Sequence, residues 1–161
     1  MSDVSEYEAS LRAGQVARPP GALPPHYPSC FGCGPEAEYG LHVVCRIDGD
    51  ALRTTYTFSE KHSGAPGIAH GGTVAALVDD VCGFSLFLLR RPAVTRKLEV
   101  EYLGRVLLDV EYTLRATIAE RAGRKIHMAA TLEGTTGLLV ARSKALFITV
   151  DIDHFKYHGQ S

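Results

Sequence analysis

A glycine pair followed by two carboxylates forms the stretch of this sequence best suited to chemistry. His70-Gly71-Gly72 ends a loop, and an apolar run that carries Asp79 and Asp80 follows it. Glycines let a ligand approach the backbone, and the N–H groups of a first helical turn, which lack internal partners, can stabilise an oxyanion. A carboxylate can attack an acyl carbon or activate water. The pattern therefore predicts an enzyme that acts on an acyl group.

The two carboxylates are not equivalent. Gly72 and Asp79 are seven residues apart, which is roughly 10 Å along a helix axis and too far for both to touch one carbonyl. A second copy of the chain, approaching along the small-residue face that holds Asp79, would place its Asp79 opposite Gly71. Asp80 points about 100° away, towards a salt bridge or solvent. Asp79 is therefore the predicted catalytic carboxylate.

The elements that must position these residues follow from the hydrophobic pattern. Gly71 to about Leu89 is apolar nearly all round, which predicts a five-turn helix buried on both sides. Leu41–Ile47 and Ala51–Phe58 flank the hairpin turn Asp48-Gly49-Asp50, and four alternating strands with short turns follow the helix. The first of these four strands carries on one face Val94, Arg96, Leu98, Val100 and Tyr102. We predict an α+β fold in which a curved antiparallel sheet of about six strands wraps around one long helix.

Composition restricts the function classes. The chain has 161 residues, 45% of them apolar, with 17 basic and 18 acidic residues and a net charge of −1. This balance gives no support for nucleic-acid or membrane-surface binding, and no apolar run is long and uncharged enough to suggest a bilayer span. No secretory signal is visible at the N-terminus, so we expect a cytoplasmic protein. The expected organisation is a proline-rich lead-in over 1–28, one domain over 29–150 and a tail over 151–161.

The cysteines raise the question of a metal. Cys30-Phe31-Gly32-Cys33 has the spacing of half a zinc site, but no second pair at that spacing follows. His26 or His42 would complete a site in principle. We interpret the motif as a tight glycine-rich turn with reduced thiols, and we predict no metal.

From Cys30 to about Val150 the chain resembles the hotdog-fold acyl-coenzyme A thioesterases of the phenylacetic-acid-degradation type. The resemblance rests on Cys30-Phe31-Gly32-Cys33-Gly34-Pro35, Gly40-Leu41, Gly67-Ile68-Ala69-His70-Gly71-Gly72, Leu77-Val78-Asp79 and Val100-Glu101-Tyr102-Leu103. It implies hydrolysis of acyl-coenzyme A to a carboxylic acid and free coenzyme A, with no cofactor because coenzyme A is part of the substrate. It also implies a homodimer or homotetramer with active sites at the subunit interface.

The resemblance assigns roles to the residues that match. Gly71 would supply the N–H of an oxyanion hole, and Asp79 of the partner subunit would be the general base or nucleophile. Thr95 matches a Ser or Thr that orients water or the acid. His70 would shape the loop and contact the thioester, or would be a loop histidine bonded to the backbone; both readings stay open.

Substrate contacts are harder to assign. Similar sequences often have Asn or Gln six residues before the histidine, where this chain has Gly64, with His62 and Ser63 as candidate substitutes. Gly72 would line the same loop. Candidate partners for the phosphorylated end of coenzyme A are Arg90, Arg91, Arg96, Lys97, Arg121, Arg124 and Lys125, of which we single out Arg96.

Two other functions remain open from the sequence. A hydratase or dehydratase of enoyl-coenzyme A would use His62 or His70 together with Asp79. A non-catalytic acyl-coenzyme A-binding protein would account for Gly64 in place of the amide.

Overall fold

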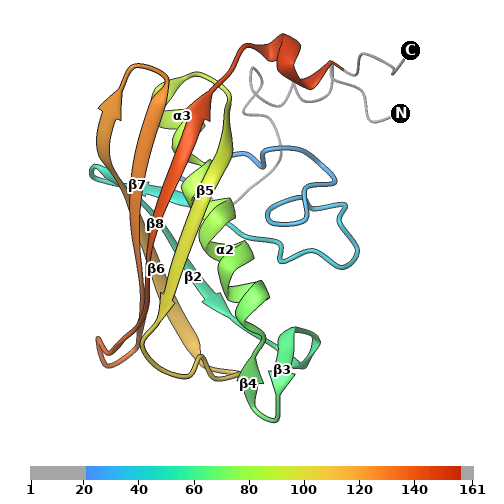
Figure 1. Ribbon diagram of the computed structural model, residues 1–161. Helices are drawn as coiled ribbons and strands as arrows, with labels where there is room; N and C mark the ends of the chain where they lie inside the picture. The colour runs from blue at the N-terminus through green and yellow to red at the C-terminus, as the bar shows by residue number, and fades with distance from the viewer. Residues whose placement is uncertain (1–20, 157–161) are drawn as a thin grey trace.

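A six-stranded antiparallel sheet wraps around one helix in the computed structural model, which describes residues 21–156 (Figure 1). The strand order is β1-β2-β6-β7-β8-β5. The strands are β1 (Arg46–Asp48), β2 (Ala51–Thr57), β5 (Ala93–Tyr102), β6 (Glu111–Ala122), β7 (Lys125–Gly134) and β8 (Leu139–Thr149). Every neighbouring pair is antiparallel. The predicted α+β architecture is confirmed.

The central helix α2 (Gly71–Gly83) lies against the concave face of the sheet (Figure 1). Its buried apolar residues Val74, Leu77, Val78 and Val81 form the middle of the core. Because the sheet alternates inward and outward residues, it supplies the other half of this core.

The prediction of one continuous helix to Leu89 is wrong. A break at Phe84 separates α2 from the short helix α3 (Ser85–Leu89). Phe84 N–H lies 3.2 Å from the carbonyl oxygen of Asp80 and 3.1 Å from that of Val81, a tightened last turn. Gly83, a poor helix former, precedes the break.

The stretch Gly71–Leu89 contradicts the expectation that no apolar run is long and uncharged enough to suggest a bilayer span. It has 19 residues and a mean hydropathy of 1.7, so by length and composition it is apolar enough to cross a membrane. The same properties are expected of a core helix, and Figure 1 shows this stretch packed inside the sheet. Half of it is buried in the protein.

A small hairpin leads into α2. A 3₁₀ turn, η1 (Glu60–His62), precedes β3 (Ser63–Ala65) and β4 (Ile68–Ala69), which pair with each other in a segment predicted as loop. Backbone bonds of 2.8 Å from Ala69 to Val106 and 3.0 Å from Leu108 to Gly67 tie it to the loop after β5. A second 3₁₀ turn, η2 (Ile152–Phe155), lies in the predicted tail.

Residues 21–45 cover the side of α2 that faces away from the sheet (Figure 1). The predicted strand Leu41–Ile47 is wrong over 41–45, because Leu41 N–H donates to Phe31 and Val43 N–H to Gly32, at 2.8 and 2.9 Å. These bonds join the segment to the cysteine loop instead of to the sheet. We call residues 21–45 the cover.

The cover also shows where the lead-in packs. Leu23 N–H donates to the Cys45 carbonyl at 2.8 Å, and Ala22 forms a bridge with Arg46. Residues 22 and 23, in the described part of the predicted lead-in, therefore pair with the backbone of the domain that follows. Residues 1–20, the first part of the predicted lead-in, lie outside the described residues.

A β-bulge interrupts β5. Thr95 pairs with Phe147 and Lys97 with Leu146, which leaves Arg96 as the extra residue. The bulge changes the alternation predicted for this strand, so that Thr95 reaches α2 and Arg96 is exposed. Among the described residues β5 pairs only with β8, and its other edge is open.

Candidate active site

Asp79 and Thr95 form the first half of the site. Thr95 Oγ donates a hydrogen bond of 2.8 Å to Asp79 Oδ1. Partial burial raises the pKa of the Asp79 carboxyl group, and the bond from Thr95 opposes that rise. A carboxylate with a raised pKa is a stronger base than an ordinary surface acid, so this pair is suited to taking a proton from water.

The first turn of α2 forms the second half. His70 is the N-cap, and its Nδ1 accepts the N–H of Gly72 at 2.9 Å. The His70 carbonyl accepts the N–H groups of Thr73 and Val74 at 3.0 and 3.2 Å. Within residues 21–156 the Gly71 N–H alone in this turn has no acceptor.

The three residues of the predicted oxyanion loop differ in their hydrogen bonding. Gly71 offers an N–H donor at the positive end of α2. Gly72 has its N–H committed to His70, and His70 is bonded to the backbone, the second of the two readings left open for it.

Tyr102 is a neighbour of this loop that the sequence did not assign. Its hydroxyl donates to the Gly71 carbonyl, and a Cβ built on Gly71 would lie 3.4 Å from the phenol ring. Beside them lies a hollow of about 380 Å³ whose lining includes Ile68, Val74 and Leu103. The available signal was the position of Tyr102 at the end of a strand in a motif that similar sequences share.

Strand β5 aligns both halves along α2. It runs antiparallel to the helix, with Thr95 beside Asp79 and Tyr102 beside Gly71. Both groups therefore lie next to β5, the strand with the open edge. The fold keeps Gly71 and Asp79 about two helical turns apart within one chain, as the spacing predicted.

The other predicted substrate contacts lie apart from Asp79. His62 Nδ1 accepts the Ser59 N–H at 3.0 Å, and the His62 carbonyl accepts the His70 N–H at 2.7 Å. Ser63 is exposed on β3, and Arg96 is the exposed bulge residue. His62 thus supports the loop that presents the helix start.

Gly64 is a packing requirement of that loop. A Cβ at Gly64 would lie 2.7 Å from the Cα of His70. No side chain fits there unless the loop moves, so the amide common in similar sequences has no room at this position.

We expect Gly64→Ala to lower the free energy of unfolding by about 1–3 kcal/mol, because the new methyl group overpacks the His70 backbone. Gly64→Asn should be at least as destabilising. Gly104→Ala is the matched control, since its Cβ would meet only Val140, at 3.8 Å. Urea unfolding measures all three, and equal stability of Gly64→Ala and Gly104→Ala would contradict the packing argument.

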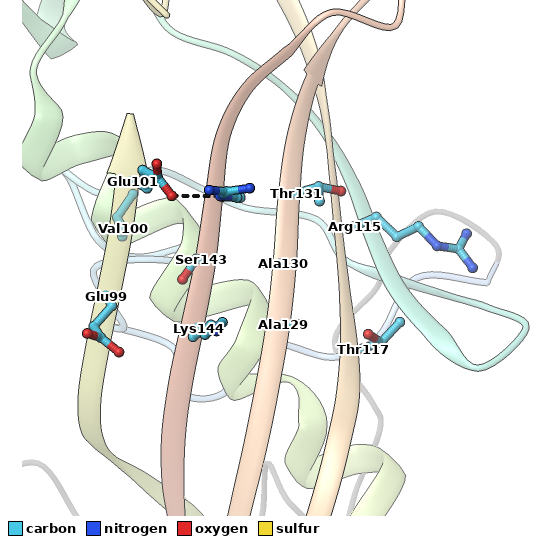
Figure 2. Close-up of a pocket in the computed structure, with 11 residues that line it drawn as sticks. Glu99, Val100, Glu101, Arg115, Thr117, Ala129, Ala130, Thr131, Ser143 and Lys144 are labelled. Carbon is cyan, nitrogen blue, oxygen red and sulfur yellow. Dashed lines mark hydrogen bonds and ion pairs between the residues drawn. The ribbon is translucent and has the colours of Figure 1, made fainter. Parts of the chain in front are cut away.

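The outer face of the sheet has a separate hollow (Figure 2). Two rows of cross-strand neighbours cross this hollow. One row consists of Glu101, Arg142, Thr131 and Arg115, and the other of Glu99, Lys144, Ala129 and Thr117. Arg142 Nε donates to Glu101 at 2.6 Å. This hollow is charged and lies on the opposite face of the sheet from α2, so we do not assign it to the chemistry of Asp79.

A third group of titratable residues lies on the cover side of α2. His26 Nδ1 is 3.1 Å from Cys33 Sγ and 3.2 Å from Asp80 Oδ1, and Cys30 Sγ is 3.5 Å from the same carboxylate oxygen. Asp80 is buried and forms the salt bridge that was one of its two predicted roles. The other candidate ligand, His42, bonds to the Ala37 carbonyl instead.

The charges of this group depend on one another. Burial lowers the pKa of His26, but the bonds to Asp80 and Cys30 outweigh it and raise that pKa to about 9. The hydrogen bond with Cys33 lowers the pKa of Cys30 to about 3 and raises that of Cys33. Burial raises the pKa of Asp80. The sequence signal for the group was the spacing His26-x₃-Cys30-x₂-Cys33; nothing in it indicated Asp80.

Each comparison with known proteins gives matches to thioesterases. A model of the thioesterase superfamily matches residues 66–141. Acyl-coenzyme A thioesterase THEM4 of Rattus norvegicus is 29% identical over 91 residues, which are 56% of this chain and 39% of the relative. A solved protein of the thioesterase superfamily is similar with a TM-score of 0.70 and 27% identity, over 76% of this chain and 61% of that one.

A hypothetical thioesterase of Streptococcus pneumoniae TIGR4, solved with coenzyme A, shares the fold with a TM-score of 0.62 at 19% identity, over 66% of this chain and 86% of its own. The chain thus spans well under half of the curated relative that it matches and about three fifths of the first structure.

Proposed function

We propose that this protein hydrolyses acyl-coenzyme A thioesters to a carboxylic acid and free coenzyme A, because residues 66–141 match a model of the thioesterase superfamily and the sheet and central helix form a hotdog fold. The observation that carries the proposal is that two groups lie beside the same edge strand: a Gly71 N–H with no acceptor among residues 21–156, and an Asp79 carboxylate held by Thr95. The thioesterase relative and the coenzyme A-bound neighbour support the substrate class.

The proposed reaction uses few groups. The Gly71 N–H and the positive end of α2 stabilise the negative charge that develops on the thioester carbonyl oxygen. Asp79 takes a proton from water as the water oxygen bonds to the carbonyl carbon. The carbon–sulfur bond then breaks, and the leaving coenzyme A thiolate takes the proton that Asp79 holds, which restores the carboxylate. Thr95 holds the carboxylate in position through its hydroxyl.

We further propose that two copies of the chain complete each site. A two-fold axis beside Ala75, midway between Gly71 and Asp79, would place the Asp79 of one copy opposite the Gly71 of the other. The same two-fold axis would pass β5 midway between Thr95 and Tyr102. The open edges of β5 in the two copies would then pair with each other. Both midpoints agree with one antiparallel arrangement of two subunits.

The direct test is thiol release from a panel of short, long and aromatic acyl-coenzyme A esters, with the carboxylic acid measured in parallel. We expect equal amounts of thiol and acid from at least one ester. Conversion of an enoyl-coenzyme A without thiol release would instead favour a hydratase. That alternative is weakened because His62 and His70 each have Nδ1 committed to a backbone N–H. Tight binding with no turnover would favour a binding protein.

Thr95→Val should lower kcat about tenfold with little change in KM, because it removes one hydrogen bond to a charged group and keeps the side-chain shape. Thr95→Ser retains the hydroxyl and should retain most of the activity. The two variants are compared on the best ester of the panel. If Val and Ser behave alike, Thr95 does not position Asp79.

A further inference from the structure

The group on the cover side of α2 has the composition of a metal site. Its four side chains are His26, Cys30, Cys33 and Asp80, and one ligand atom from each lies within 4.8 Å of all the others. Three of them come from one short loop of the cover, and the fourth comes from the central helix. All are buried or half-buried.

The distances in this group suit tetrahedral coordination. Atoms bound to one tetrahedral zinc ion at about 2.0–2.3 Å lie about 3.3–3.8 Å from each other. Three of the separations are 3.1 Å for Cys33 Sγ to His26 Nδ1, 3.2 Å for His26 Nδ1 to Asp80 Oδ1 and 3.5 Å for Cys30 Sγ to Asp80 Oδ1. A small outward shift of the side chains admits a cation at the centre.

We propose that His26 Nδ1, Cys30 Sγ, Cys33 Sγ and a carboxylate oxygen of Asp80 bind one Zn²⁺ ion that joins the cover to α2. Two thiolates, an imidazole and a carboxylate are ligands that zinc accepts in a four-coordinate site. Since the protein supplies all four, the ion has a structural role and no position for substrate. This replaces the interpretation of the cysteines as a simple turn.

The surroundings hold the ligands in place. A Cβ at Gly32 would lie 2.1 Å from Asp80 Oδ1, so the glycine between the cysteines is what lets the loop close over the carboxylate. The backbone N–H of His26 donates a hydrogen bond of 3.2 Å to Cys33 Sγ, and this bond stabilises a thiolate. Asp80 Oδ2 is buried and accepts no hydrogen bond from the described residues, so no donor among them competes with a cation for this oxygen.

The imidazole of His26 is also fixed by packing. Its ring centroid lies 4.1 Å from that of Phe84, and a Cβ on Gly83 would lie 3.3 Å from its Cε1. The break between α2 and α3 therefore lies directly under the proposed ligand. This packing orients Nδ1 towards the cysteines. Residues outside the coordination sphere commonly fix the orientation of metal ligands in this way.

Metal content of the purified full-length protein tests the proposal without any substrate, so its result is independent of the proposed thioesterase activity. After equilibration with excess Zn²⁺ and gel filtration, we expect about one zinc ion per chain. Cys33→Ser and Asp80→Asn should each lower the retained zinc at least tenfold. Cys82→Ala is the matched control, because it removes a buried thiol of the same helix outside the group, and it should retain the ion.

A second measurement covers variants that fail to fold. Wild-type protein stripped with a chelator should bind Co²⁺ and show the visible bands of tetrahedral cobalt with a thiolate-to-cobalt charge-transfer band. Stripping should lower Tm, and Zn²⁺ should restore it. The proposal would be overturned if the wild-type protein stays metal-free under these conditions. It would also be overturned if the protein forms a Cys30–Cys33 disulfide and binds neither Zn²⁺ nor Co²⁺.

Discussion

Asp79→Asn is expected to lower kcat for thiol release by about 10²- to 10⁴-fold, the contribution typical of a positioned general base. Asparagine has the shape of aspartate, and its Oδ1 can still accept the hydrogen bond that Thr95 donates at 2.8 Å. What it lacks is the basic oxygen that takes a proton from water. The loss should therefore fall on kcat, with binding of a coenzyme A ester nearly unchanged in calorimetry.

Two controls make this result specific. Glu133→Gln removes an exposed carboxylate at the end of β7 and should leave turnover unchanged. Circular dichroism and Tm should match between Asp79→Asn and the wild type. Equal rates of thiol release from these two proteins would remove Asp79 from the mechanism.

Gly71→Pro is expected to reduce kcat by about 10²- to 10³-fold, the effect of losing one oxyanion-hole donor. Proline has no N–H, and the first position of a helix is where it is best tolerated. The preceding residue, His70, already has φ −62° and ψ 131°, a conformation that proline favours in its neighbour. The substitution therefore deletes the proposed donor while the helix start is retained.

Gly71→Ala is the matched variant, because it adds a Cβ near the Tyr102 ring, at 3.4 Å, and keeps the N–H. It should retain far more activity than Gly71→Pro. If both variants lose the same activity, crowding against Tyr102 is responsible and the N–H is not the donor.

The same pair of variants tests whether the site is shared. Asp79→Asn and Gly71→Pro chains are each expected to be nearly inactive alone. A mixed dimer of the two would contain one site with an intact Gly71 from the first chain and an intact Asp79 from the second. Recovery of about a quarter of wild-type activity in co-expressed, statistically mixed dimers is expected from this symmetry. No recovery would place both groups of each site in one chain.

Much of the fold was predictable because strong local patterns specify it. The alternation of apolar and polar residues identified β6 and β7, and their short turn at Gly123 matches a backbone with φ +60°. The His70-Gly71-Gly72 sequence marked the start of α2 for a local reason, since its histidine caps the helix.

The parts that could not be predicted depend on contacts between distant residues. Strict alternation placed Arg96 on the face of β5 that carries Leu98, and only pairing with β8 creates the bulge that brings Thr95 to Asp79. Likewise, Leu41 to Cys45 are apolar enough for a strand, but their N–H groups bond to the cysteine loop. His26 and Asp80 are 54 residues apart in the sequence, and no periodicity relates them.

The cover has a consequence for how this domain can be inherited and recombined. The stretch that matches the superfamily begins at residue 66, yet Cys33, Leu41, Val43 and Cys45 are only 0–4% exposed and complete the core around α2. The segment that matches the superfamily model is therefore smaller than the segment that builds the core. A transplanted domain that starts at Arg46 would expose the apolar side of α2 to chaperones and proteases. A domain that includes the cover, residues 21–45, would keep this surface buried.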